Sequence, residues 1–374
     1  MIINDKTLKY GERIIFKLRS LFSDYGYSQY KMSKFEEYDL YVRNKDFLIS
    51  EGVITFTDTN GRLMALKPDV TLSIIKTSKD IQGFVQKFYY DENVYRVSDK
   101  THNFKEIMQV GLECIGDIDD YCLGEVVALA AKSLKMIHDD AVLDISHLGV
   151  LSEVFDWAGI ASDDRDTVMK LVGAKNLHEL MAFCKDKGIP EEKTEIIREL
   201  VCTYGKPCDV IKKLKTMLSG IINSDTIDRL WSIVDSLGED EGRDIVRIDF
   251  SVISDIKYYN GIVFRGFVSG LPQSVLSGGQ YDRLMKNMQR RSGAVGFAVY
   301  LDYIERLEAP CESYDVDTVV MYDETTSASY VREIAKKYHA DGSVSVQRSL
   351  PERFRYKRLV KIREGEVSVV ENNA

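Results

Sequence analysis

The sequence is poor in the residue types that metal sites, disulfide frameworks and membrane spans require. Its 374 residues include only five histidines, and no HExxH pattern occurs. The cysteines are scattered, with no CxxC or Cys/His cluster at zinc spacing, so we expect reduced thiols and no metal centre. The six of them are Cys114, Cys122, Cys184, Cys202, Cys208 and Cys311.

Long apolar runs are also missing. No stretch approaches the roughly 20 apolar residues that a membrane helix needs. Met1 leads directly into the polar segment IINDKT, which lacks the pattern of a signal peptide. We therefore expect a cytoplasmic protein without membrane contact.

Positive charge is in deficit as well. The chain carries 50 Lys and Arg residues against 59 Asp and Glu residues, a net charge of −9. This balance gives no support to a nucleic-acid partner, which would be held through clustered cations, and none is expected. Hydrophobic residues make up 44% of the chain, which is ordinary for a globular protein, and its length suggests two or three domains.

The most informative stretch runs from Phe88 to Gly116. Its first part, Phe88 to Arg96, is rich in aromatic and β-branched residues and predicts a strand, with a possible turn at residues 91–93. A polar loop follows to Asn103, and a second strand is predicted from Phe104 to Ile115, where apolar and polar residues alternate.

The period of two divides the second strand into an apolar face and a mixed face. Gln109, Gly111 and Glu113 fall on the mixed face, so a glycine lies between an amide and a carboxylate. A glycine there leaves space above the sheet, and the two polar side chains can address a small polar ligand. The alternative is a half-exposed strand that presents polar residues to water.

These residues resemble motif 2 of class II aminoacyl-tRNA synthetases in its histidyl form. The shared pattern is Tyr95-Arg96, a polar loop, then Lys105-Glu106-x-x-Gln109-x-Gly111-x-Glu113. The family has arginine at the position of Lys105. The spacing and residue types agree over nearly thirty residues, which makes the match specific.

Two further segments support the resemblance. Leu66 to Thr71 resembles the family's LRPE or LRPD-x-T segment, which implies that Asp69 and Thr71 contact the ammonium group of an amino acid. A Pro-Asp turn that caps the following helix is the simpler interpretation, and both can hold. Residues 254–264 resemble the histidyl signature RGLDYYTGTVFE, which implies that Tyr258 and Tyr259 line a histidine pocket.

The chain departs from the family where arginines serve adenylation. Ser254 takes the arginine position of the histidyl signature, Gln280 that of the GGRYDxL segment, and Tyr303 that of motif 3. Tyr300 also replaces a motif 3 glycine. Since fixed cations must meet the charge that develops on a triphosphate, we expect no adenylation, no catalytic residue and no cofactor. Arg306 lies one helical turn after Tyr303 and could in part substitute for the motif 3 arginine.

Motif 1 of the family is a long helix followed by a strand, and it builds the dimer interface. Apolar residues at helical spacing predict a helix that ends near Gly26. Residues 27–36 are then interpreted as an extended strand. Ser33 stands near the family's motif 1 proline, which is a departure. The resemblance implies a homodimer formed through residues 5–40.

We expect an α+β fold with a class II synthetase-like antiparallel sheet flanked by helices. Residues 1–150 and 239–309 would form this core, 151–238 a helical insertion, and 310–374 a small α/β C-terminal unit that resembles a shortened anticodon-binding domain. The C-terminal unit carries a basic cluster between Arg348 and Arg363 that is either a phosphate or acidic-partner contact or an ordinary surface.

The retained amino-acid pocket and the lost arginines together resemble the regulatory subunits of ATP phosphoribosyltransferase, which are paralogues of histidyl-tRNA synthetases. The resemblance implies a non-catalytic protein that binds and activates a short-form catalytic subunit and mediates histidine feedback. A divergent amino-acid-activating enzyme and a synthetase paralogue with another partner remain alternatives. The residues that we expect to bind histidine are Asp69, Thr71, Arg96, Gln109, Glu113, Tyr258 and Tyr259.

Overall fold

The computed structural model divides the chain into two compact units, Met1–Leu307 and Glu308–Ala374. It describes residues 8–44, 52–98, 101–238, 241–253, 259–307, 314–350, 352–363 and 365–372. Each unit is described separately below.

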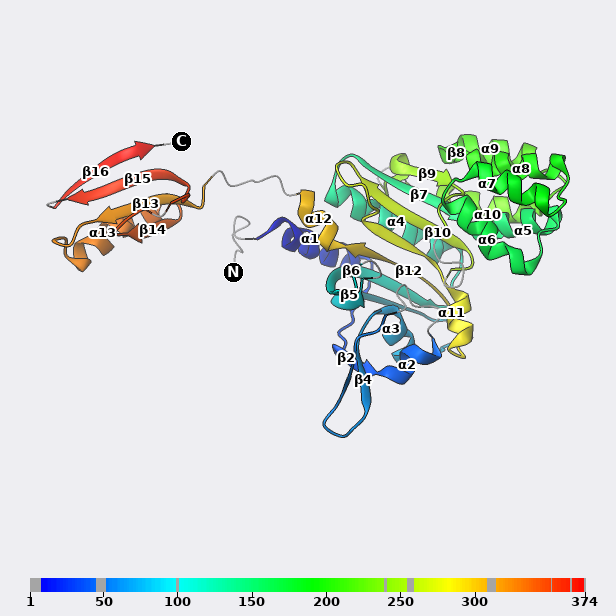
Figure 1. Cartoon of the computed structure of the whole chain (residues 1–374), viewed down its shortest axis with the longest axis horizontal. Coiled ribbons are helices and arrows are strands. Elements are labelled where there is room, and N and C mark those ends of the chain that lie inside the picture. The colour runs from blue at the N-terminus through cyan, green and yellow to red at the C-terminus, as the bar shows by residue number, and fades with distance from the viewer. Residues whose placement is uncertain are drawn as a thin grey trace. The chain divides into compact units, whose positions relative to one another are not determined.

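Unit 1 is built on a nine-stranded sheet (Figure 1). Most neighbouring strands are antiparallel, and only the pairs β1–β5 and β7–β9 are parallel. The strands, in their order across the sheet, are β1 (Ser28–Gln29), β5 (Val85–Val97), β6 (Phe104–Gly116), β12 (Gly293–Tyr300), β11 (Leu276–Gln280), β10 (Ile262–Val268), β7 (Ala141–His147), β9 (Val246–Asp249) and β8 (Tyr204–Gly205).

One face of this sheet packs on helices α1 (Tyr10–Asp24) and α4 (Asp120–Ile137), whose apolar stripes join it in a single core. The opposite face is covered in part by α2 (Tyr38–Arg43), α3 (Thr71–Thr77) and α11 (Asp282–Asn287), around a second core cluster. After β12 come α12 (Leu301–Ile304) and the short 3-10 helix Glu305–Leu307. The predicted fold class is confirmed by this arrangement.

Strands β5 and β6 are paired along their whole length, from Val85 opposite Gly116 to Val97 opposite Phe104. The predicted turn at residues 91–93 is therefore wrong, because the strand continues through it. On its other side, β6 pairs with β12 only from Gln109 to Gly116. Residues 93–97 and 104–108 consequently form a two-stranded ribbon, which continues past the point where β12 ends its pairing with β6.

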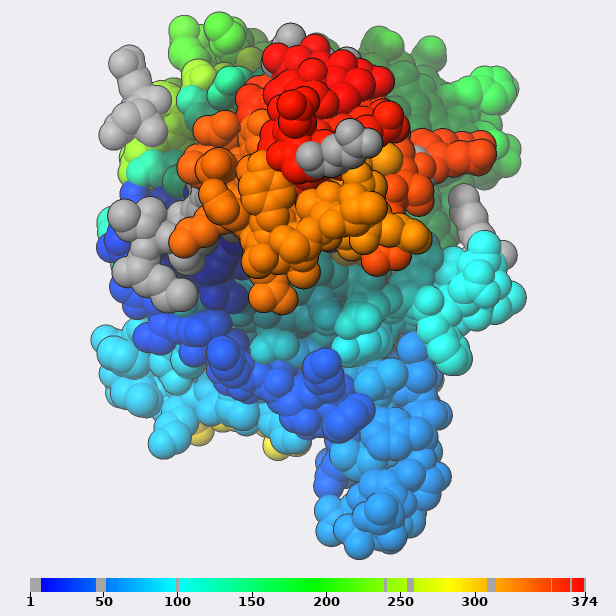
Figure 2. All heavy atoms as spheres, turned by 90° about the vertical axis from the view of Figure 1, so that its left-hand side faces the viewer, coloured from blue at the N-terminus to red at the C-terminus, as the bar shows by residue number. Residues whose placement is uncertain are grey.

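The motif 1 region has the predicted helix but little of the predicted strand. Gly26, with φ of 80°, ends α1 as expected. Residues 27–36 contain only β1 and the start of β2 (Phe35–Glu37). β2 joins a separate small sheet with β4 (Leu63–Leu66) and β3 (Thr55–Thr57), in which β3 and β4 form a hairpin around Asn60-Gly61. This hairpin projects from the body of unit 1 (Figures 1 and 2).

Residues 148–235 are mostly helical, as their sequence pattern predicts, but the short strand β8 lies among them and pairs with β9 in the large sheet. The helices are α5 (Leu148–Ala158), α6 (Arg165–Gly173), α7 (Leu177–Asp186), α8 (Glu191–Cys202), α9 (Pro207–Met217) and α10 (Ser224–Asp235), with short 3-10 turns at Ser162–Asp164 and Arg243–Ile245. Their buried side chains join the same apolar cluster as the sheet. Trp157 and Trp231 are only half-buried, each with a cation over its ring. The division of unit 1 into core and insertion remains a proposal.

Unit 2 is a four-stranded sheet with one helix. The strand order is β14 (Val344–Gln347), β13 (Val316–Tyr322), β15 (Tyr356–Arg363) and β16 (Glu366–Asn372), and the helix is α13 (Ala328–His339). β15 and β16 form the predicted hairpin around Gly365, whereas β14 was not predicted. The assignment of this unit as a remnant anticodon-binding domain remains a proposal.

Candidate functional site

A pocket of about 470 Å³ lies on the sheet face opposite α1 and α4. Strands β5, β6, β10, β11 and β12 and the start of α3 supply its lining. Tyr258 lies outside the described residues. The other six predicted ligand residues all line the pocket, namely Asp69, Thr71, Arg96, Gln109, Glu113 and Tyr259.

The alternation of β6 places its residues as the sequence predicts. Gln109 and Glu113 are 4% and 2% exposed and face the pocket. Val110 and Leu112 are on the other face, in the core against α1 and α4. The amide and the carboxylate are thus buried in a cavity, and the alternative of a polar face turned to water is wrong.

The space above Gly111 is not left for a ligand. A Cβ added at Gly111 would lie 2.5 Å from the hydroxyl oxygen of Tyr90. Tyr90, directly across from Gly111 on β5, therefore fills the gap between Gln109 and Glu113 with its own ring. The glycine admits an aromatic wall of the pocket, which corrects the sequence-based interpretation.

Glu113 is the most constrained group in the pocket. Its Oε1 accepts a hydrogen bond of 2.5 Å from the Thr71 hydroxyl, and its Oε2 accepts one from the Tyr281 hydroxyl. Burial raises the pKa of Glu113 to about 8, although the two hydroxyl donors act in the other direction and nearby Asp69 adds to the increase. Gly296 makes room for this carboxylate, because a Cβ there would overlap it.

Asp69 serves both the helix and the pocket. Its Oδ1 accepts a 2.9 Å hydrogen bond from the backbone N–H of Leu72 in the first turn of α3. Burial raises its pKa, while the Leu72 N–H and the charge of Arg96 oppose that shift. The capping interpretation of the Pro-Asp segment is therefore confirmed, since the carboxylate accepts from the first turn of α3. It also lines the cavity, and its contact with an ammonium group remains a prediction.

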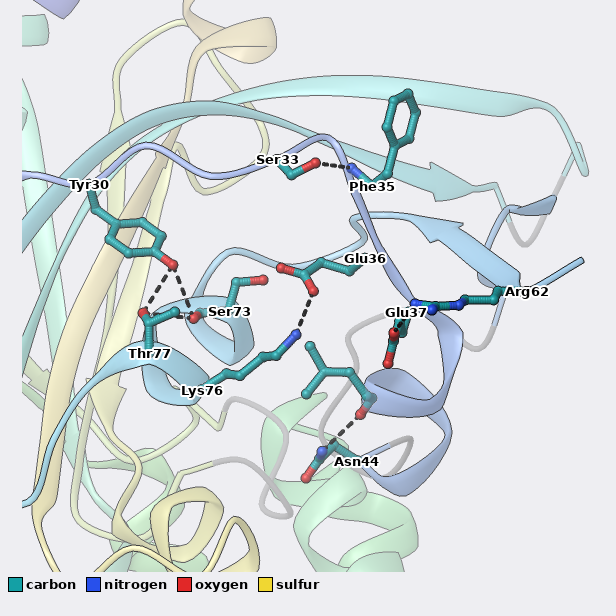
Figure 3. A network of polar contacts seen from close by, with 11 residues as sticks. Tyr30, Ser33, Phe35, Glu36, Glu37, Asn44, Arg62, Ser73, Lys76 and Thr77 are labelled. Atoms are coloured by element: carbon teal, nitrogen blue, oxygen red, sulfur yellow. Dashed lines mark hydrogen bonds and ion pairs between the residues drawn. The ribbon is translucent and has the colours of Figure 1, made fainter. Parts of the chain in front are cut away.

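A polar network fixes α3, which positions Thr71 (Figure 3). The Tyr30 hydroxyl donates to the backbone carbonyl of Ser73 at 3.2 Å and lies 3.0 Å from the Thr77 hydroxyl. Lys76 of α3 forms an ion pair of 2.8 Å with Glu36 of β2. These contacts tie the helix to the segment around β1 and β2.

A buried cation holds the linker between β4 and α3 against strand β5. The Lys67 side chain is fully buried and its Nζ lies 2.6 Å from Glu92 of β5. Arg96, further along β5, donates from Nε to the carbonyl oxygen of Pro68 at 3.1 Å. Lys67 and Arg96 therefore fasten the Asp69 segment to the strand that flanks it.

The remaining predicted residue, Tyr259, closes the pocket over β11. A Cβ added at Gly279 would lie 2.7 Å from its ring, so the glycine allows the ring to approach the sheet. Burial raises the pKa of its hydroxyl well above the usual value. Tyr259 thus remains a neutral hydroxyl at physiological pH.

Two tyrosines line the pocket at the positions where the resemblance to motif 3 predicts a glycine and an arginine, and Tyr300 is paired with Gln109. The Tyr300 hydroxyl lies 2.7 Å from the Ser277 hydroxyl, and the Tyr300 and Tyr303 ring centroids are 6.1 Å apart. The Arg306 guanidinium lies 5.8 Å from the centroid of the Tyr303 ring, and Arg306 is not among the described residues that line the pocket.

The other two departures are placed differently. Ser254 lies outside the described residues. Gln280 does not line this pocket. Its amide donates to Asp282 at 2.7 Å, and it borders a second cavity of about 490 Å³ near Gly116 and Ser292. The change at Gln280 therefore does not alter this pocket directly.

Sequence reasoning missed several lining residues, including Tyr90, Tyr281, Arg265 and Ser277. Tyr281 and Ser277 belong to the segment that resembles GGRYDxL, so a signal for them existed. Tyr90 and Arg265 needed the register between strands. Among the described residues, no group of three or more His, Cys, Asp or Glu side chains is placed to hold a metal ion. Within the same residues, none of the helices has the length and apolar character to cross a bilayer.

Comparison with known proteins accords with this geometry. The family profile described as histidyl-tRNA synthetase matches residues 3–304. A protein from Caldanaerobacter subterraneus subsp. tengcongensis, named ATP phosphoribosyltransferase regulatory subunit, is 31% identical over 77% of this chain and 76% of its own length. A protein of the same name from Oceanobacillus iheyensis is 28% identical over 79% of this chain and 74% of its own.

Solved structures show the same fold. One is described as an ATP phosphoribosyltransferase regulatory subunit/histidyl-tRNA synthetase from Bacillus halodurans, with a TM-score of 0.75 and 22% identity over 94% of this chain and 93% of that one. A chain of an ATP phosphoribosyl transferase complex from Thermotoga maritima has a TM-score of 0.61 and 21% identity over 80% of this chain and 98% of its own. By profile, sequence and fold, the chain belongs to the histidyl-tRNA synthetase-like family of ATP phosphoribosyltransferase regulatory subunits.

Proposed function

We propose that this chain binds and activates a short-form ATP phosphoribosyltransferase catalytic subunit, and that histidine bound in the pocket mediates feedback inhibition. The observation that carries the proposal is a contrast within one pocket. Six of the side chains predicted to bind the amino acid line it around buried carboxylates, while Tyr300 and Tyr303 line it at the positions where motif 3 has a glycine and an arginine. Family membership and the Thermotoga maritima complex support the partner.

The proposed ligand contacts follow from the charges. Asp69, Gln109 and Glu113 would meet the ammonium and imidazole of histidine, with Thr71 and Arg96 beside them. Tyr258 and Tyr259 would wall the pocket. A buried polar ligand must have its hydrogen bonds satisfied, so loss of one charged partner should cost about 1.5–3 kcal/mol, roughly 10- to 150-fold in affinity. Calorimetric titration of Glu113→Ala with histidine tests this, and an unchanged affinity would place histidine elsewhere.

A non-catalytic role is the second part of the proposal. Loss of one group that stabilises transition-state charge typically costs about 100- to 1000-fold in rate. With tyrosine at the motif 3 position, histidine-dependent exchange of pyrophosphate into ATP should remain at background. Clear exchange would favour the alternative of a divergent amino-acid-activating enzyme.

The decisive experiment is reconstitution with the short catalytic subunit of the same organism. Turnover of ATP and phosphoribosyl pyrophosphate is measured with and without this chain across a histidine titration. Feedback requires that histidine binds one state of the complex better, and a coupling of about 1–3 kcal/mol changes inhibition by about 5- to 150-fold. By linkage, the catalytic subunit must shift the histidine affinity by the same factor. A chain that neither binds nor activates that subunit would refute the proposal.

Assembly also belongs to the proposal. We infer a homodimer formed through the region of α1 and β1, within a larger hetero-oligomer. Phe16 of α1 is 46% exposed, which supplies an apolar side chain for such a contact. Sedimentation of the isolated chain at micromolar concentration should give a dimer, and a monomer would contradict the inference.

A further inference from the structure

One cation on the pocket wall, Arg265, forms no ion pair within the part of the chain that the structure describes. Arg265 of β10 is half-buried and lines the cavity. Its Nη2 donates to the backbone carbonyl of Ile253 at 2.9 Å, which fixes the guanidinium without neutralising it. Within the described residues, Arg265 forms no ion pair with a carboxylate, although Asp144 lies directly across from it on β7.

The strand register connects Arg265 to the opposite wall in a straight line across the sheet. Arg265 is paired with Ser277, Ser277 with Ala298, Ala298 with Gly111, and Gly111 with Tyr90. Residues directly opposite each other on adjacent strands point to the same face. The row therefore has a large side chain at each end and three small residues between them. The Tyr90 ring covers Gly111, and the Ser277 hydroxyl contacts that of Tyr300, so Ala298 is left as the floor of a short trough.

The length of this trough suits one small molecule. Strands lie about 4.8 Å apart, so Arg265 on β10 and Gly111 on β6 are separated by three spacings, about 14 Å between Cα atoms. Glu113 is two residues further along β6. Arg265 and Glu113 both line the same pocket of about 470 Å³, a volume that suits one small molecule.

The distribution of charge distinguishes Arg265 from the other lining arginine. The charge of Arg96 acts on Asp69 and opposes the rise that burial causes in the pKa of that carboxyl, so the charge of Arg96 is already in part compensated. At the carboxylate end, Asp69 and Glu113 suit a cationic group. An amino acid also carries a carboxylate, and a buried carboxylate needs a cation with several donors. Arg265 supplies that cation at the other end of the trough.

We propose that Arg265 binds the α-carboxylate of the zwitterionic amino acid whose ammonium end faces Asp69 and Glu113. The inference rests on the proposed histidine site and adds a residue to it. The histidyl signature quoted above ends in glutamate at the position that Arg265 occupies. The side chain at this position therefore carries the opposite charge from the one in the signature, which suits an anionic group of the ligand.

The test compares histidine with histidinamide, which lacks the negative charge but keeps the ammonium and the imidazole. Calorimetric titrations use the wild-type full chain and Arg265→Gln, with Arg62→Gln on the exposed hairpin as the control. Wild type and the control should prefer histidine. Arg265→Gln should weaken histidine binding by about 10- to 150-fold, the range for a charged hydrogen bond, and leave histidinamide within about twofold. Arg265→Lys should retain part of the preference.

Each other outcome has a defined meaning. Equal weakening of both molecules in Arg265→Gln would make the arginine a structural support of the Ile253 segment and overturn the inference. Retained preference in Arg265→Gln, with its loss in Arg96→Gln, would assign the carboxylate to Arg96. ATP binding that disappears in Arg265→Gln would place a phosphate there instead. If wild type binds neither molecule, the proposed histidine site itself fails. Unchanged melting temperatures would establish that the variants are folded.

Discussion

The buried carboxyl of Glu113 should make the stability of unit 1 fall as the pH rises. Its pKa is raised from 4.5 to about 8 in the folded chain, mainly by burial. Between these two values the folded state holds a proton that the unfolded state has lost. The contribution of Glu113 is therefore fully present below pH 4.5 and is lost as the pH rises through 8.

The magnitude follows from the size of the shift. Each pKa unit corresponds to about 1.4 kcal/mol, so the whole difference of 3.5 units, from 4.5 to 8, amounts to roughly 5 kcal/mol. Roughly half of it develops between pH 5 and pH 7. Glu113→Gln cannot ionise and keeps a side-chain oxygen that accepts a hydrogen bond. The variant should gain stability relative to wild type by these amounts as the pH rises, and the difference should level off above pH 8.

Urea unfolding of both proteins at pH 5, 6, 7, 8 and 9 measures this difference. The contributions of groups common to the two proteins cancel in the comparison. Asp69, whose pKa is also raised, loses a repulsive neighbour in the variant, and this adds to the gain in stability at higher pH. Glu106→Gln, at an exposed glutamate of the same strand, serves as the matched control. A difference between wild type and Glu113→Gln that does not change with pH would refute the argument that burial governs this carboxyl.

Two further substitutions test the construction of the pocket. Gly296→Ala should abolish histidine binding and lower stability, because its Cβ would overlap the Glu113 carboxylate. Gly173→Ala is the control and should bind histidine normally, because its Cβ would meet no atom closer than 3.8 Å. Normal binding by both variants would contradict the packing around Glu113. Lys67→Met should destabilise the chain by about 3 kcal/mol in urea unfolding, because Glu92 loses the one ion pair that it forms with the described residues. The double variant Lys67→Met/Glu92→Leu should recover much of that loss, and no recovery would show that Lys67 acts by some means other than its charge.

The sequence was informative wherever a local pattern determines the structure. Alternation in β6 correctly separates Gln109 and Glu113 from Val110 and Leu112, because strand periodicity is a property of the backbone alone. Gly26 and the Asn60-Gly61 turn mark their boundaries because few other residues adopt those backbone angles. The resemblance to the synthetase family then directed attention to Asp69 and Thr71, which periodicity does not single out.

Features that depend on which strands are neighbours were not accessible in the same way. Tyr90 fills the space above Gly111, and Arg265 lies in line with it across four strand pairings, yet 175 residues separate the two along the chain. The turn expected at residues 91–93 was suggested by polar residues. Asp91 is instead held in the strand by Arg19 and Gln29 from other elements. Tertiary contacts outweighed local preference there.

The two-stranded ribbon of β5 and β6, which continues past the pairing with β12, connects the protein surface with the pocket. At its tip Val97 pairs with Phe104, which is 73% exposed, and the next pair inward contains Arg96, whose side chain reaches the pocket. Ile107, three residues from the tip on the other strand, also lines the pocket. The two strands of the ribbon are hydrogen-bonded to each other, so a molecule that binds Phe104 from outside and displaces it also moves Arg96 and Ile107 at the pocket wall. The ribbon thus offers a short route by which binding at the protein surface can change the shape of the cavity, and by which a ligand in the cavity can change the surface.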